Sequence, residues 1–275
     1  MNPHAKLSST PAAILASFVS NRQLIWQMTK RDITGRYRGS VLGLTWSFFH
    51  PLIMLAVYSF VFSVVFQARW STGGGSKTEF ALALFVGMIV HGLMAECVNR
   101  APGTILSNPS YVKKVVFPLE ILPWISMGAA LFHITVSLIV WAVFYLLINH
   151  TLHWTALFFP LIFMPLILLT MGISWFLASI GVYLRDIGQI TGVMTTVLLF
   201  MSPVFYPASR LPEPYRTFLF LNPLTFIIEQ MRDVLMWGKM PNFTGLLIAF
   251  SVGSLVAWLG FVWFQKTRRG FADVI

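Results

Sequence analysis

Long runs of apolar residues, separated by short polar or charged segments, are the main pattern along this chain. A helix needs about 20 predominantly apolar residues to cross the hydrocarbon core of a bilayer. The pattern therefore predicts an all-α polytopic membrane protein with six transmembrane helices, in which residues 1–275 form a single transmembrane domain. The expected spans cover residues 41–66, 80–98, 121–148, 152–183, 187–202 and 243–264.

The segment before the first span mixes apolar and basic residues at helical spacing. Within residues 21–39, Leu24, Ile25, Met28 and Trp26 supply an apolar side. This composition predicts an amphipathic interface helix that lies in the membrane surface. A solvated cytoplasmic tail is the alternative. Residues 11–20 resemble a weak signal-peptide core, but the basic segment that follows would resist translocation, which argues against a signal peptide.

The segment between the fifth and sixth spans, residues 210–239, does not fit a simple spanning scheme. Its two moderately apolar pieces are separated by Asn222 and Pro223, and Glu229 and Arg232 interrupt the second piece. We expect a re-entrant or interfacial pair of half-helices, which is permitted at membrane depth where protein or water covers the backbone. An amphipathic helix resting on the outer surface is an equal alternative.

Composition and charge exclude an ordinary soluble enzyme. Hydrophobic residues make up 57% of the chain and charged residues 10%, whereas soluble domains carry about 25% charged residues. The net charge is +10, and the basic residues fall mainly on the side of the N-terminus if six helices cross the membrane. This asymmetry predicts that both termini are cytoplasmic and argues against nucleic acid as a partner.

Few side chains within the expected spans could carry chemistry. Glu96 and Arg100 have the i, i+4 spacing of a helical ion pair. His91 and His133 could form a proton relay with Glu96, but neutral, hydrogen-bonded histidines are the favoured interpretation. No metal site is expected, because zinc sites need a third protein ligand that the sequence near His150 and His153 lacks.

The nucleotide and catalytic motifs that the sequence could hold are not supported. Residues 76–78 only faintly resemble a phosphate-binding loop, since glycine does not precede Lys77. No nucleophile, base and acid constellation stands out. We expect no enzymatic activity and no cofactor on this chain.

Aromatic residues occur along the whole first span. They lie on all sides of the expected helix instead of only at its ends, as in Trp46, Phe49 and Tyr58. Such rings can stack on the apolar face of a sugar. Bulky core and lipid packing is the simpler interpretation, and the spacing alone favours it.

Three motifs carry a resemblance to a known family. The first is RDITGRYRGSVLGLTW at residues 31–46, followed by Pro51, and the second is FPLEILP at residues 117–123. The third is NPLT at residues 222–225, followed by Arg232 and Gly238. From residue 22 onward the chain resembles permease subunits of ABC exporters that move lipid-linked polysaccharides. It is most similar to the O-antigen exporters, with capsule and teichoic-acid exporters as near relatives.

The resemblance implies partners and sites. Such permeases form homodimers, and each copy docks a separate cytoplasmic ATPase, which binds ATP and Mg. The family's coupling helix corresponds to residues 104–116, and its periplasmic gate helices to residues 210–239. The coupling candidates are Asn108, Pro109, Ser110, Tyr111, Val112, Lys113 and Lys114. The gate candidates are Asn222, Pro223, Glu229 and Arg232.

The resemblance also implies a function. The expected activity is ATP-driven export of an undecaprenyl-pyrophosphate-linked polysaccharide from the cytoplasmic to the periplasmic side of a bacterial inner membrane. The candidates for binding the lipid pyrophosphate are Lys30, Arg31, Arg36 and Arg38, which otherwise only fix topology. The candidates for an aromatic channel lining are Trp46, Phe49 and Tyr58. Export of capsule, teichoic acid, lipid or drug is the alternative, and a membrane-embedded glycan-modifying enzyme is the alternative outside transport.

Overall fold

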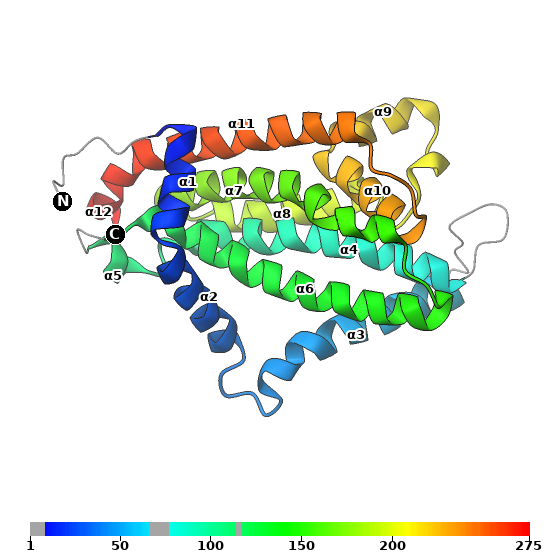
Figure 1. Cartoon of the computed structure of the whole chain (residues 1–275). Coiled ribbons are helices and arrows are strands. Elements are labelled where there is room, and N and C mark those ends of the chain that lie inside the picture. Colours follow the sequence, from blue (N-terminus) through cyan, green and yellow to red (C-terminus); the bar gives the residue numbers. More distant parts are fainter. Residues whose placement is uncertain (1–8, 66–76, 114–116) are drawn as a thin grey trace.

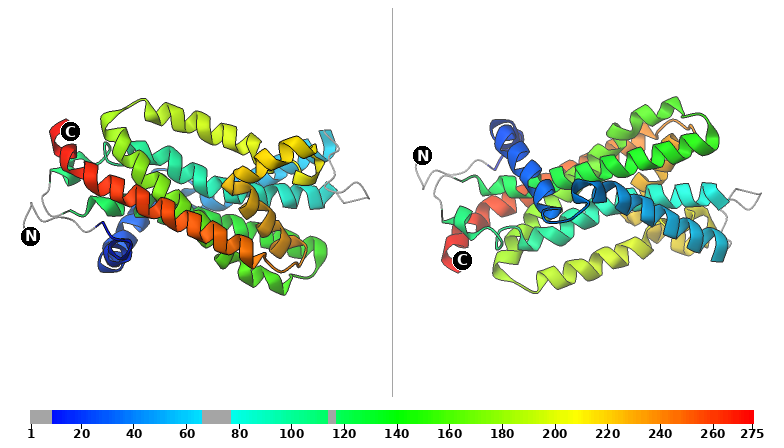
Figure 2. Two further views of the ribbon diagram at one scale, coloured as in Figure 1. Left: turned by 90° about the horizontal axis from the view of Figure 1, so that it is seen from above. Right: turned by 90° about the horizontal axis from the view of Figure 1, so that it is seen from below.

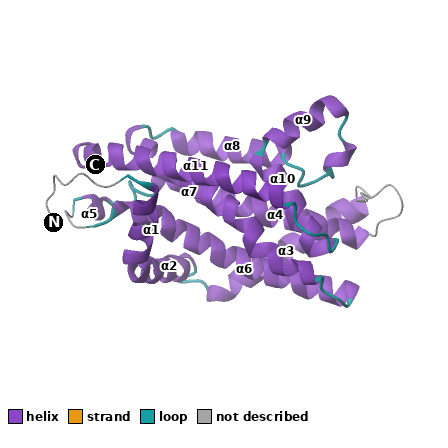
Figure 3. Ribbon diagram, turned by 45° about the horizontal axis from the view of Figure 1, so that its top comes forward, coloured by secondary structure: helices purple, strands orange, loops and turns teal. Residues whose placement is uncertain are grey.

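The computed structural model describes residues 9–65, 77–113 and 117–275, and all regular elements among these residues are helices (Figure 3). Five helical stretches are long and apolar enough to cross a membrane. They are Gly43–Phe62, Thr78–Gly103, Leu119–Asn149, Trp154–Tyr183 and Phe243–Val274. The expected all-α membrane class is thereby confirmed.

The fifth expected span is the exception. Its helix, α8 (Ile187–Met201), has 15 residues and counts among the shorter apolar helices of the described chain. Six transmembrane helices therefore stay a prediction. Helix α8 ends where Ser202 takes an extended conformation before Pro203.

Helix α4 (Lys77–Arg100) lies at the centre of the bundle. It contacts α3 (Trp46–Tyr58), α6 (Leu122–Asn149), α7 (Phe159–Tyr183) and α8, as Figure 1 also shows. Its apolar residues are buried on all sides, as expected for a helix surrounded by others. This position brings the polar side chains near the C-terminal end of α4 into contact with several other elements.

Helices α7 and α11 (Phe243–Thr267) run side by side in all three ribbon views (Figures 1 and 2). Their backbones touch at Gly172 and Gly260, because a Cβ atom at Gly260 would clash with the carbonyl oxygen of Gly172. Small residues at such crossings let apolar helices approach closely, and close van der Waals packing is what holds helices together in lipid.

Two helices form the N-terminal part of the described chain. Helix α1 (Pro11–Ser20) occupies the stretch that resembled a signal-peptide core, and α2 (Arg22–Arg36) lies within the expected interface helix. Ile25, Thr29 and Ile33 form the buried face of α2, which packs on α6, whereas Trp26 is 61% exposed. The α2 helix is thus seated on protein along one side, and its position in a membrane surface stays a prediction.

The two ends of the bundle carry different short helices (Figure 1). Helices α1, α5 (Pro109–Val112) and α12 (Phe271–Val274) lie at one end, and helices α9 (Glu213–Leu221) and α10 (Pro223–Met236) lie at the other. Both ends of the described chain are therefore at the same end of the molecule. This arrangement agrees with a common side for the two termini, and their cytoplasmic location stays a prediction.

The segment between α8 and α11 folds into two helices, α9 (Glu213–Leu221) and α10 (Pro223–Met236). They meet at Asn222, whose side-chain oxygen accepts a hydrogen bond of 3.0 Å from the Leu224 N–H and so caps α10. Most residues of α10 are buried against α4 and α7. Protein thus covers most of this helix. Its depth in the membrane stays a prediction.

Candidate functional site

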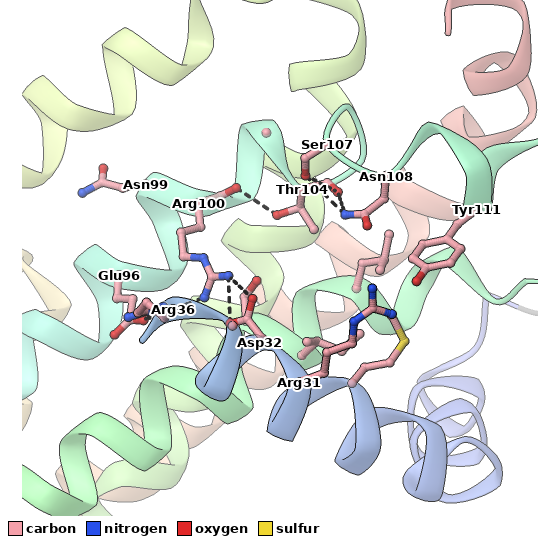
Figure 4. Close-up of a pocket in the computed structure, with 16 residues that line it drawn as sticks. Arg31, Asp32, Arg36, Glu96, Asn99, Arg100, Thr104, Ser107, Asn108 and Tyr111 are labelled. Atoms are coloured by element: carbon pink, nitrogen blue, oxygen red, sulfur yellow. Dashed lines mark hydrogen bonds and ion pairs between the residues drawn. The ribbon is translucent and has the colours of Figure 1, made fainter. Parts of the chain in front are cut away.

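A cavity of about 930 Å³ opens between α2, α4, α6 and the residues around α5 (Figure 4). We call it the polar cavity. The charged residues that line it are Arg31, Asp32, Arg36, Glu96 and Arg100. They come from α2 and from the end of α4, whose charged side chains meet at this end of the bundle. The polar cavity therefore presents three guanidinium groups and two carboxylates, with a formal balance of +1.

Ion pairs join most of these charges. Arg100 Nη2 donates to both carboxylate oxygens of Asp32, at 2.7 and 2.9 Å. Arg36 Nη2 donates to Glu96 Oε1 at 2.5 Å, and the same oxygen lies 3.8 Å from Arg100 Nη1. The i, i+4 pair of Glu96 and Arg100 is therefore present, but Arg36 is the nearer partner. These side chains are between 22% and 35% exposed, so solvent weakens each ion pair.

His91 and His133 do not contact Glu96 directly, as a proton relay between these three residues would require; each ring has another partner. Arg36 Nη1 lies 3.0 Å from His133 Nε2, and since a guanidinium only donates, His133 accepts there as a neutral ring. The Tyr37 hydroxyl lies 3.5 Å from His133 Nδ1, and burial raises the pKa of Tyr37. His91 Nε2 donates to the Thr195 carbonyl at 2.9 Å. The two rings thus serve helix contacts, as the neutral interpretation predicts.

A second cavity of about 630 Å³ adjoins the polar cavity. Its lining is mainly apolar and includes Trp46, Tyr58 and His50, so we call it the aromatic cavity. Arg36 and Glu96 line both cavities. Phe49, the third aromatic candidate, does not line this cavity: it is 43% exposed and meets Trp46 edge-on at a ring distance of 6.5 Å.

The coupling candidates surround α5, a helix of only four residues. Asn108 and Tyr111 line the polar cavity, and the ring of Tyr111 stacks on Phe117 at 4.3 Å with the planes 9° apart. Pro109, Ser110 and Lys113 are exposed, and Val112 is partly buried. Lys114 lies outside the described residues.

A buried ion pair connects this region to the end of α11. Arg268 Nη1 donates to Glu120 Oε2 at 2.6 Å, and Arg268 Nη2 donates to the Phe117 carbonyl at 3.0 Å. Ser17 of α1 donates to the other oxygen of Glu120 at 3.2 Å. The stacked pair of Tyr111 and Phe117 is thus tied to both terminal regions of the described chain.

The gate candidates gather at the opposite end. Arg232 has no exposed surface, and its guanidinium donates to the carbonyls of Ala83, Pro203 and Val204 at 2.8, 2.6 and 2.9 Å. Glu229 Oε1 lies 3.4 Å from Arg232 Nη1. Burial lowers the pKa of Arg232 to about 10, although Glu229 acts in the opposite direction, so the guanidinium stays charged at pH 7. Burial likewise raises the pKa of Glu229, a shift that Arg232 opposes.

A comparison with protein families decides the classification. The family described as ABC-2 type transporter matches residues 23–236, which is most of the chain. The chain belongs to this ABC-2 family. The resemblance to permeases of polysaccharide-exporting ABC transporters, predicted from the three motifs, is confirmed by this match and by the names of the curated relatives.

Three relatives illustrate the range of names within the family. The O-antigen export system permease protein RfbA of Klebsiella pneumoniae is 24% identical over 92% of this chain and 95% of its own length. The protein of the same name from Myxococcus xanthus is 25% identical over 92% and 96%. The polysialic acid transport protein KpsM of Escherichia coli is 21% identical over 76% and 79%.

The structure of this ABC-2 protein separates the four cationic candidates. Arg31 and Arg36 line the polar cavity. Lys30 does not line it, and its ammonium lies 4.8 Å from the centre of the Trp26 ring. Arg38 is exposed and lines neither cavity. The third cation that lines the polar cavity is Arg100, which the sequence indicated only as the partner of Glu96.

The two remaining gate candidates, Asn222 and Pro223, lie at the start of α10. Asn222 Nδ2 donates to Ser202 Oγ at 2.8 Å, and Pro223 is the first residue of α10. No group of three histidine, cysteine, aspartate or glutamate side chains among the described residues could hold a metal ion.

Proposed function

We propose that this chain is the membrane-spanning permease of an ATP-driven exporter of undecaprenyl-pyrophosphate-linked polysaccharide. Two copies form the channel at their seam, in a bacterial inner membrane, with both termini cytoplasmic. A separate ATPase subunit binds ATP and Mg and supplies the energy. The polysaccharide moves from the cytoplasmic to the periplasmic side.

One structural observation carries this proposal: a cationic cavity adjoins an aromatic one. Guanidinium groups pair with phosphate oxygens in a bidentate manner, so Arg31, Arg36 and Arg100 suit a lipid pyrophosphate. Aromatic rings offer sugars an apolar surface and leave the hydroxyl groups to water, so Trp46 and Tyr58 suit the glycan. The order of the two cavities matches a substrate whose charged linkage lies next to its sugars.

The position of the coupling candidates supports energy transfer from an ATPase. Asn108 and Tyr111 line the same polar cavity as the arginines. A movement of α5, driven by the ATPase, would change the shape of the cavity that holds the headgroup. Pro109, Ser110 and Lys113 are exposed at this end of the bundle and are available to contact the partner.

The names of relatives that match most of the chain support the proposed substrate class. Two of the relatives described above are named for O-antigen export, so O-antigen is the favoured cargo. Polysialic acid, for whose transport KpsM is named, is the second candidate cargo. Identifying the lipid-linked glycan that co-purifies with the native complex by mass spectrometry distinguishes the two.

Reconstitution of the permease with its ATPase in proteoliposomes tests the headgroup assignment. Arg36→Gln and Arg31→Gln are expected to reduce export of the lipid-linked glycan, because each removes a cation from the polar cavity. Arg38→Gln is the matched control, since Arg38 is an exposed arginine that lines neither cavity. Equal export by all three variants and the unmodified chain would show that these arginines only fix topology.

A further inference from the structure

The ion pair between Arg36 and Glu96 stands at the junction of the two cavities. Both residues line the polar and the aromatic cavity. They come from α2 and α4, sixty positions apart in the chain, and Figure 4 shows their side chains facing each other. Any group that passes from one cavity to the other at this point meets the pair.

Glu96 holds Arg36 less completely than Asp32 holds Arg100. Arg36 contacts Glu96 through one oxygen atom, whereas Arg100 contacts both oxygens of Asp32. A phosphate group offers a guanidinium two parallel hydrogen bonds, which are stronger and more directional than a single one. The pair of Arg36 and Glu96 is therefore the one in the polar cavity that an incoming phosphate exchanges most readily.

Glu96 also has a second partner within reach. Arg100 Nη1 is buried, has no hydrogen-bond partner among the described residues, and lies 3.8 Å from Glu96 Oε1. A buried donor without a hydrogen-bond partner destabilises the folded protein. A small rotation of the Glu96 side chain toward Arg100 would satisfy this donor at the moment when Arg36 is released. The carboxylate thus has two alternative positions, one on each arginine.

We propose that Glu96 is a built-in competitor for the anion site of Arg36, and that a phosphate-bearing headgroup displaces it onto Arg100. The exchange breaks the contact at the junction and connects the polar cavity with the aromatic cavity. In the resting protein Glu96 keeps the junction closed and occupies the guanidinium. This inference rests on the proposed function, because it takes the polar cavity as the place where the headgroup binds.

Titration of the purified full-length permease in phosphatidylethanolamine and phosphatidylglycerol nanodiscs with inorganic pyrophosphate, followed by calorimetry, tests the competition. Glu96→Gln is expected to lower the dissociation constant about fivefold, the change that corresponds to the upper value for a partly exposed ion pair. Asp32→Asn is the matched comparison, because it removes an equal charge from the same cavity but releases Arg100 instead of Arg36. Equal tightening by both variants would mean that only net charge matters, and would overturn the proposal.

Thiol labelling tests the opening of the junction. Met54 lines the aromatic cavity, so Met54→Cys in a Cys97→Ala background reports the access of a charged, water-soluble thiol reagent. Pyrophosphate is expected to accelerate labelling in the otherwise unmodified chain. With Glu96→Gln added, labelling is expected to be fast with or without pyrophosphate, and with Asp32→Asn it stays dependent on pyrophosphate. Slow, pyrophosphate-independent labelling of the Glu96→Gln variant would overturn the proposal.

The same titration separates this inference from the function on which it rests. If Arg36→Gln leaves pyrophosphate binding unchanged, the headgroup assignment fails and the inference fails with it. If Arg36→Gln weakens binding but Glu96→Gln does not tighten it, the headgroup assignment stands and only the competition is wrong. Glutamine has nearly the shape of glutamate, and gel filtration of each variant shows whether it folds.

Discussion

The guanidinium of Arg232 fills the space next to Gly87: a Cβ atom at Gly87 would lie only 2.8 Å from Arg232 Nη2. The same Cβ would lie 3.2 Å from the Cα atom of Val204, so the backbone of Val204 prevents an added methyl group from shifting away from Arg232. The position of the Arg232 side chain, which α10 places against α4, therefore requires glycine at position 87.

Gly87→Ala is expected to displace Arg232 and weaken its bonds to the carbonyls of Pro203 and Val204. The expected loss of stability is about 1–3 kcal/mol, the range for a buried polar group that loses its partner. Thermal unfolding of the detergent-solubilised protein measures the effect. Gly92→Ala is the matched control on the same helix, because nothing lies within 4 Å of its Cβ position. Equal midpoints for both variants would contradict the prediction.

Arg232→Met is expected to destabilise the protein more strongly, by about 3–5 kcal/mol, because it removes the donor of three buried carbonyls and leaves Glu229 without its partner. Arg232→Lys keeps the charge but not the planar fork, and is expected to fall in between. The same thermal unfolding experiment ranks the variants. Lys239→Met, at a residue whose side chain is 67% exposed, serves as the control and is expected to change stability little. A ranking in which lysine equals arginine would show that charge alone matters here.

Two of the three aromatic candidates are expected to matter for glycan export. Trp46→Ala and Tyr58→Ala remove rings that line the aromatic cavity, whereas Phe49→Ala removes one outside its lining. We expect the first two to lower the export rate roughly three- to tenfold, as the loss of a ring contact would, and the third to have a smaller effect. Export and ATPase activity are measured together in proteoliposomes. A parallel fall of both in every variant would indicate packing defects.

Tyr111 is expected to transmit movement from the ATPase through its stack on Phe117. Tyr111→Ala removes the stack and is expected to reduce glycan-dependent ATPase activity and export by at least about twofold, the smallest change that the loss of an aromatic pair implies. Tyr111→Phe keeps the ring and is the control. If Tyr111→Ala retains full activity, α5 does not couple through this contact.

The ion pair of Arg268 and Glu120 is expected to hold the end of α11 onto the segment after α5. A double-mutant cycle with Arg268→Gln and Glu120→Gln is expected to give an interaction energy of about 1–3 kcal/mol, because both side chains are mostly buried. The pair of Arg216 and Glu213 is the internal control, since Glu213 is 90% exposed, and its cycle should come out near zero. Similar energies for the two pairs would contradict a special role for the first.

The local parts of this architecture follow from the sequence because they depend on neighbouring residues. Apolar runs predict the long helices, and the i, i+4 spacing predicts the contact of Glu96 with Arg100. The nearer partner, Arg36, is sixty positions away, and nothing in the spacing of either residue indicates that α2 folds back onto α4. Contacts of this kind depend on how whole helices pack.

For Arg232, the sequence predicts the kind of environment but not the partners. A charged residue in an apolar helix is expected to face the interior of the bundle and to pair with another charge or with backbone carbonyls, and this side chain is fully buried. The sequence does not reveal that three carbonyls, contributed by α4 and by the chain after α8, converge at that point. Likewise, the sequence gives no reason to prefer Trp46 over Phe49 as a channel-lining residue. Only the structure shows that Trp46 lines the cavity between α3, α4 and α6 and that Phe49 does not.

The early end of α8 gives Arg232 one more task. Helix α8 stops at Met201, and Ser202, Pro203 and Val204 continue as a buried turn in which the Val204 N–H donates to the Ser202 carbonyl at 2.7 Å. Arg232 supplies donors to the carbonyls of Pro203 and Val204, which a further helical turn would otherwise have supplied. A side chain of α10 thus stands in for the missing turn of α8. If helix α10 moved outward alone, those two carbonyls would lose their hydrogen-bond donors. The two helices must therefore move together, unless water molecules replace the Arg232 donors.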